Sequence, residues 1–95
     1  MLKNVRNETS LDNWIENMGY GDEGLVKIDG FDEAAIGVVE RCAGSPILCY
    51  DESKIIRKLA EDMSGEEATE YFEYNIRGAW VGEQTPCFLV KRRRK

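Results

Sequence analysis

The run Ile47-Leu48-Cys49-Tyr50 constrains the fold more than any other part of the chain. It lies between the chain-breaking segment Ala43-Gly44-Ser45-Pro46 and Asp51, whose short acidic side chain is a preferred helix N-cap. A run this short that is apolar on both faces is typical of a strand at the centre of a sheet. The chain therefore needs a second strand beside this one and helices that cover it.

Apolar residues at helical spacing predict four helices around this strand. We expect them over residues 10–18, 31–42, 52–63 and 65–76, and Asp51 should cap the third. The fourth has the clearest start, because Ser64 and Glu67 form a capping-box pattern. Tyr71 and Phe72 are among the side chains that this helix should bury.

Two further strands are expected, over residues 25–28 and 87–90, and the second should lie beside the central strand. This order of elements predicts an α+β fold: one small domain with a two- to three-stranded sheet and about four short helices packed on it. The domain should span residues 10–90, between a flexible N-terminus of residues 1–9 and a basic tail of residues 91–95. Because the core is small, pairing with a second copy as a homodimer would bury more area.

Charge is divided between an acidic body and this basic tail. The net charge is −5, from 18 acidic and 13 basic residues, and five of the basic residues are Lys91, Arg92, Arg93, Arg94 and Lys95. Residues 1–90 alone carry −10. An acidic body repels nucleic acid and favours basic partners, such as the phosphate-binding grooves of other proteins, although a solvated surface is the simpler interpretation. The tail binds phosphate, acts as a localisation signal, or is a free end of mutually repelling charges, which is the interpretation that we favour.

Residue types that carry catalysis are scarce. Histidine is absent, which removes the commonest general base and the commonest metal ligand. Cys42, Cys49 and Cys87 lie in apolar segments without zinc-binding spacing, so we expect them to be packed as small hydrophobic residues. The sequence therefore predicts no catalytic residue, no metal and no other cofactor. A cysteine-dependent metal protein or enzyme is the alternative.

Glutamates line one face of the fourth predicted helix. Glu66, Glu70 and Glu73 follow one another at spacings of four and three residues. Like charges at this spacing destabilise a helix by a few tenths of a kcal/mol per pair unless a basic group meets them. A row of carboxylates can imitate a phosphate backbone, so these residues are candidates for partner binding; a solvated helix face is the alternative.

A glycine-bounded loop follows that helix and contains Trp80 and Glu83. Tryptophan in such a loop can anchor a protein interface, because it buries a large area at a small entropic cost. The interpretation that we favour is that Trp80 closes the core beneath the last helix. Under the other interpretation Trp80 and Glu83 are loop contacts with a partner.

Several segments together are similar to small acidic proteins encoded in phages and prophages. The similarity is carried by Gly37-Val38-Val39-Glu40-Arg41-Cys42, Pro46-Ile47-Leu48-Cys49-Tyr50-Asp51, the glutamate-rich stretch 63–76, the loop 78–83 and Thr85-Pro86. It covers most of residues 11–86. The resemblance implies no established activity and no catalytic residue. It implies a context, since antagonists of host defence, including anti-CRISPR proteins, are recruited from such accessory phage proteins.

Three hypotheses follow. The first is a non-enzymatic phage-type protein that inhibits a host nucleic-acid-handling or defence complex by binding a host protein with a basic nucleic-acid-binding surface. The second is a small nucleic-acid-associated regulator in which the tail provides affinity and the body dimerises. The third is the cysteine-dependent protein. No apolar run could span a membrane and no secretion signal precedes the domain, so we expect a cytoplasmic protein, within the host cell, that does not contact membranes.

Overall fold

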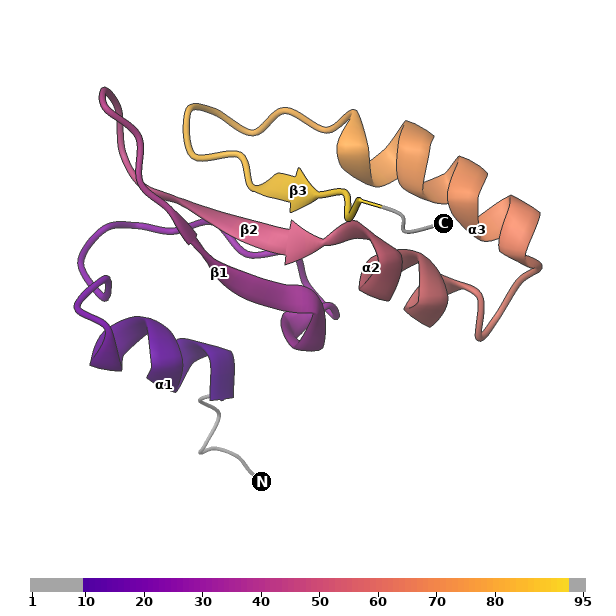
Figure 1. Ribbon diagram of the computed structural model, residues 1–95, viewed down its shortest axis with the longest axis horizontal. Coiled ribbons are helices and arrows are strands. Elements are labelled where there is room, and N and C mark those ends of the chain that lie inside the picture. Colours follow the sequence, from indigo (N-terminus) through magenta and orange to yellow (C-terminus); the bar gives the residue numbers. More distant parts are fainter. Residues whose placement is uncertain (1–9, 93–95) are drawn as a thin grey trace.

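A three-stranded mixed sheet lies at the centre of the computed structural model, which describes residues 10–92 (Figure 1). Its order is β1 (Ala35–Val39), β2 (Ile47–Asp51) and β3 (Cys87–Leu89), with β1 antiparallel and β3 parallel to β2. The predicted central strand is confirmed, because β2 is paired on both edges and Leu48 and Tyr50 are fully buried. The pairing of the last strand with β2 is also confirmed.

Three α-helices surround the sheet: α1 (Ser10–Asn17), α2 (Glu52–Leu59) and α3 (Gly65–Tyr71). A 3-10 turn, η1 (Asp32–Ala34), precedes β1, and a π-helical segment, η2 (Phe72–Arg77), continues α3 without a break. The predicted α+β fold of one small domain is confirmed, although four helices were expected. No helix within residues 10–92 is long and apolar enough to cross a membrane.

Local capping signals define where α2 and α3 begin. The Asp51 carboxylate accepts the Ser53 backbone N–H at 3.0 Å. The Ser64 hydroxyl accepts the Glu67 N–H at 3.1 Å, and the Glu67 carboxylate accepts the Ser64 N–H at 3.1 Å. Both caps satisfy backbone donors that have no partner inside a helix, which is why these starts agree with the sequence prediction.

The core forms where α1, β2, α2 and η2 meet. Its fully buried large side chains include Leu48, Tyr50, Ile55 and Phe72. Phe72 packs edge-to-face on Phe88 of β3, with 5.1 Å between ring centroids and 85° between ring planes. The burial of Phe72 confirms its prediction, and it fixes the side of η2 that faces the sheet.

The helix predicted over residues 31–42 is wrong, because this segment forms η1 and β1. The apolar residues of Ile36-Gly37-Val38-Val39 fit one helix face, but β-branched side chains and glycine disfavour a helix. Pairing with β2 in a hairpin instead satisfies the backbone, and Gly44 turns the chain with a φ of 96°. The strand predicted over residues 25–28 is also wrong: this half-buried segment has no strand partner within the described chain.

Candidate functional site

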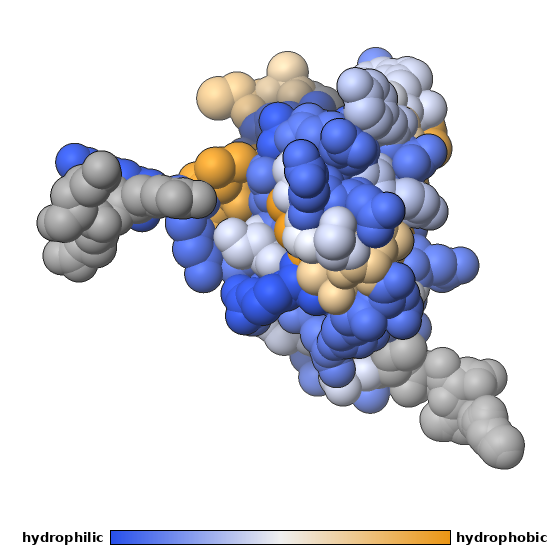
Figure 2. Space-filling view, turned by 90° about the vertical axis from the view of Figure 1, so that its right-hand side faces the viewer, coloured by the Kyte–Doolittle hydropathy of each residue, from blue (hydrophilic) through white to orange (hydrophobic). Residues whose placement is uncertain are grey.

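The candidate site is built on α3 and η2, which together present one continuous helical surface. We call the carboxylates of Glu66, Glu67, Glu70 and Glu73 on this surface the acidic helix face. All four residues are exposed. Figure 2 views the molecule from the end where α2 leads into α3 and shows a predominantly hydrophilic surface there.

The carboxylates of this face differ in whether they form a salt bridge within the described residues. Glu73 forms an ion pair with Arg77 at 3.5 Å, and Arg77 also pairs with Glu52 of α2. Glu66 and Glu70, in contrast, form no salt bridge with any residue of the part of the chain that the structure describes. The acidic helix face therefore keeps most of its negative charge available to a partner.

Two tyrosines lie beside the carboxylates. Tyr71 was expected in the core but is exposed, and Tyr74 is 83% exposed. With Glu67 and Glu70 they line a shallow hollow of about 400 Å³. The predicted burial of Tyr71 is wrong because the fully buried Ala68 and Phe72 define the inward face and Tyr71 lies to one side of it. Tyr74 lies off the apolar stripe of this helix, and that position was the available signal for its exposure.

The loop that carries Trp80 has a defined structure. The Thr85 hydroxyl accepts the Val81 N–H at 2.9 Å and donates to the Gly82 carbonyl at 2.7 Å. Gly82 has a φ of 116°, a conformation that favours glycine. These bonds tie the two ends of the loop together and hold Trp80 on a fixed turn.

Trp80 is 74% exposed, so the interpretation that it closes the core is wrong. The first half of the loop is exposed, whereas Pro86, just ahead of β3, is buried. Glu83 is exposed, and its backbone carbonyl accepts from Arg41 at 3.2 Å. Within residues 10–92, no hydrogen bond or ion pair links Trp80 or Glu83 to the acidic helix face. The structure therefore leaves the predicted set as two separate groups.

The basic tail begins with a residue that already has a partner. Lys91 donates to the carboxylate of Asp51 at 3.1 Å. Burial alone would raise the pKa of Asp51, but the hydrogen bond and charge of Lys91 outweigh it, with help from backbone N–H groups, and the pKa is lowered. Arg92 is exposed, and Arg93, Arg94 and Lys95 lie outside the described residues.

The cysteines do not all lie in the core. Cys42 is exposed, which contradicts its predicted packing, because it follows β1 at the entrance to the hairpin turn. Cys49 and Cys87 are half-buried partners on β2 and β3. Burial and the neighbouring Cys87 thiol raise the pKa of Cys49 to about 11. No group of three or more Cys, Asp or Glu side chains within the described residues could hold one metal ion.

Comparison of the chain with protein-family models, with curated proteins and with solved structures finds no match. The function of the candidate site is therefore inferred from the geometry of this chain.

Proposed function

We propose that this protein is a non-enzymatic inhibitor that binds the basic nucleic-acid-binding surface of another protein through the acidic helix face. The observation that carries the proposal is the uncompensated charge of Glu66 and Glu70 on an exposed helix. Like charges on one helix face disfavour the helix. A basic partner would remove this cost and gain charge-assisted contacts.

The spacing of the carboxylates supports phosphate mimicry. Residues 66, 67, 70 and 73 place four charges over seven helical steps, so successive charges lie on average roughly 3.5 Å apart along the helix axis. One strand of DNA carries a phosphate about every 3.4 Å. Measured along the helix axis in both cases, the linear charge density of this helix is therefore similar to that of one DNA strand.

Exposed aromatic side chains complement the charges. Proteins that bind single-stranded nucleic acid use basic grooves together with apolar or aromatic surfaces on which bases stack. Tyr71 and Tyr74 border the carboxylates, and Trp80 occupies the loop that follows. Tyrosine and tryptophan are also the side chains that contribute most to protein interfaces. Tyr74 and Trp80 would be the anchors, and Glu83 a contact at the rim.

The resemblance to phage and prophage proteins supplies the biological setting of the proposal. The partner would be a host protein of a nucleic-acid-handling or defence complex, as for anti-CRISPR proteins, and the site of action the host cytoplasm. The hypothesis that the basic tail binds nucleic acid has less support, because Lys91 is paired with a buried carboxylate.

The test compares two variants of equal charge. Glu66→Gln, Glu70→Gln and Glu73→Gln together remove three charges from the acidic helix face. The control, Asp22→Asn, Asp29→Asn and Glu61→Gln, removes three exposed charges elsewhere. Each protein is immobilised, incubated with nuclease-treated bacterial lysate at low and high salt, and the retained proteins are identified by mass spectrometry.

We expect the wild type and the control to retain a basic nucleic-acid-binding protein that salt releases, and the site variant to lose it. The wild type and the control variant should each displace the purified target from a DNA or RNA duplex, and the site variant should not. Equal retention by both variants would refute phosphate mimicry. Nucleic acid as the bound species, lost when residues 91–95 are deleted, would favour the regulator instead.

A further inference from the structure

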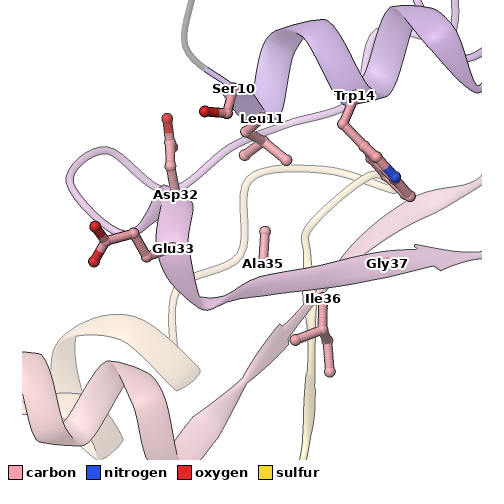
Figure 3. Close-up of a pocket in the computed structure, with 8 residues that line it drawn as sticks. All are labelled: Ser10, Leu11, Trp14, Asp32, Glu33, Ala35, Ile36 and Gly37. Carbon is pink, nitrogen blue, oxygen red and sulfur yellow. The ribbon is translucent and has the colours of Figure 1, made fainter.

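A second surface lies between α1 and β1, away from the acidic helix face. A groove of about 470 Å³ runs between the helix and the strand, and Figure 3 shows the residues that line it. Leu11 and Trp14 extend from α1 toward β1, and the indole lies over the strand near Gly37. Trp14 is partly exposed, although Leu11 of the same helix is buried. The groove therefore has an apolar wall with a large aromatic side chain accessible to solvent.

The other wall of the groove is an edge strand. In the described part of the chain, β1 pairs with β2 on one side and with no strand on the other, and α1 lies beyond it in Figure 1. An edge strand directs unpaired N–H and C=O groups outward, which is the template for adding a further strand. A helix beside such an edge confines the added strand to one path.

Gly37 leaves open space on β1 where a side chain would otherwise stand. A Cβ atom built on it would meet no atom within 4 Å, and its φ lies outside the left-handed region, so neither packing nor conformation requires glycine here. Glycine inside a strand weakens the strand and often marks a site where another backbone approaches closely. The pairing with β2 also shifts register between Ala35 and Gly37, and such irregularities are common next to binding sites.

One end of the groove is acidic. Asp32 and Glu33 of η1 line it, and neither forms a salt bridge within residues 10–92. Both residues lie at the end where β1 begins, and in Figure 3 the Asp32 carboxylate points toward Ser10 of α1 while the Glu33 carboxylate points away from the helix. An occupant with a positive charge at that end and apolar residues along β1 would complement the groove.

We propose that this groove binds an extended peptide segment of a partner protein that carries a Lys or Arg, by addition of a strand to the free edge of β1. Main-chain hydrogen bonds would provide affinity, and Trp14 and the acidic end would select the side chains. The body of a second copy is a poorer occupant, because it carries the same excess of acidic residues. The proposal does not depend on the acidic helix face.

The test uses two fluorescent peptides of about six residues, the usual strand length, in which Val and Thr alternate. One peptide carries a single Lys at its N-terminal end, and the other carries it at its C-terminal end. Binding is measured by anisotropy to the full chain. Three comparison peptides replace Lys by Glu, replace Lys by Thr, or carry N-methyl groups on alternate residues. We expect one Lys peptide to bind saturably, and the Glu and N-methyl peptides to bind at least about tenfold more weakly.

Gly37→Val is the decisive variant, because it fills the groove and suits a strand. We expect an unchanged or higher midpoint of thermal unfolding and an affinity for the Lys peptide at least about tenfold lower. Gly65→Ala, at a glycine of α3 that also has open space around it, is the control and should bind normally. Asp32→Asn with Glu33→Gln should bind the Lys and Thr peptides equally.

The proposal would be overturned by no binding of either Lys peptide, by equal binding to Gly37→Val, or by equal binding of the N-methylated peptide. A dimer of the wild type that Gly37→Val dissociates would also overturn it and assign the edge to a second copy. The variant that lacks Glu66, Glu70 and Glu73 should bind the peptide normally, so failure of the groove and failure of the inhibitor proposal are distinguishable.

Discussion

Asp51 joins β2 to α2, and its replacement tests the account of what holds this junction together. The residue ends the central strand, caps the helix through the Ser53 N–H at 3.0 Å and receives Lys91 Nζ at 3.1 Å. Its side chain is buried. One carboxylate therefore connects the sheet, α2 and the segment that follows β3, and its loss should affect all three.

The expected cost can be divided between the cap and the ion pair. Removal of an N-cap side chain costs about 1 kcal/mol. A hydrogen bond to a charged group contributes about 1.5–3 kcal/mol, but the Lys91 side chain is 59% exposed, so solvent screening reduces this to about 1 kcal/mol. We expect Asp51→Ala to lower the free energy of unfolding by about 2 kcal/mol, which is roughly 8–16 °C in a domain of this size. Asp51→Asn retains the cap, so we expect it to lower the free energy of unfolding by about half as much.

The pH dependence separates the same two contributions. The pKa of Asp51 in the folded protein lies below its ordinary value of 3.8, so the folded state favours the charged carboxylate. Its stabilising contribution is complete above the ordinary pKa and is lost as the pH falls below it, through the lowered pKa. The difference in stability between wild type and Asp51→Asn should therefore be constant near neutral pH and shrink below about pH 4.

Urea denaturation of the wild type, Asp51→Ala, Asp51→Asn and Lys91→Met, followed by circular dichroism from neutral to acid pH, provides the measurement. Lys91→Met keeps the aliphatic stem and removes the charge, so its cost should match that of Asp51→Asn. The reasoning fails if Asp51→Ala costs less than about 0.5 kcal/mol, the lower limit for a cap. It also fails if the difference in the free energy of unfolding between wild type and Asp51→Asn stays the same as the pH falls below about 4.

Three further predictions concern stability and reactivity. Ser64→Ala removes a capping box and should cost about 1 kcal/mol in urea denaturation, whereas no change would contradict the role of the cap. Tyr50→Phe leaves the Ile28 N–H without its 2.9 Å acceptor and should cost about 1–2 kcal/mol by the same assay. With a pKa of about 11, only about 0.1% of Cys49 is thiolate at pH 8, so mass mapping after iodoacetamide should show the exposed Cys42 labelled first; equal labelling would refute this.

The parts of the fold that the sequence predicts correctly are those set by local chemistry. An uninterrupted apolar run bounded by a proline turn and a helix N-cap favours a central strand, and β2 is that strand. The starts of α2 and α3 depend on side-chain to backbone bonds within four residues, so Asp51 and Ser64 identify them without tertiary information. The exposure of Glu66 and Glu70 follows from the same local periodicity.

The parts that the sequence does not predict depend on distant partners. The sequence left Trp80 as either a core or an interface residue and favoured the core, whereas the side chain is exposed beside a turn that Thr85 and Gly82 close. The π-helical turns of η2 have no sequence signature comparable to a cap, and the exposure of Tyr71 depends on which residues reach the sheet. These positions are fixed by tertiary packing and not by spacing.

Gly37 lies in the segment that was wrongly predicted as a helix, and it also lines the groove between α1 and β1. Within an expected helix this residue is an isolated weak point, and the groove between α1 and β1 has no counterpart in the sequence. Once the segment is an edge strand, the same missing side chain leaves open space opposite Trp14 and beside an acidic turn. Valine would suit the strand here, and no atom lies within 4 Å of where its Cβ would stand. A glycine that the fold does not require is therefore best explained by something that approaches the strand from outside, which is what Gly37→Val tests.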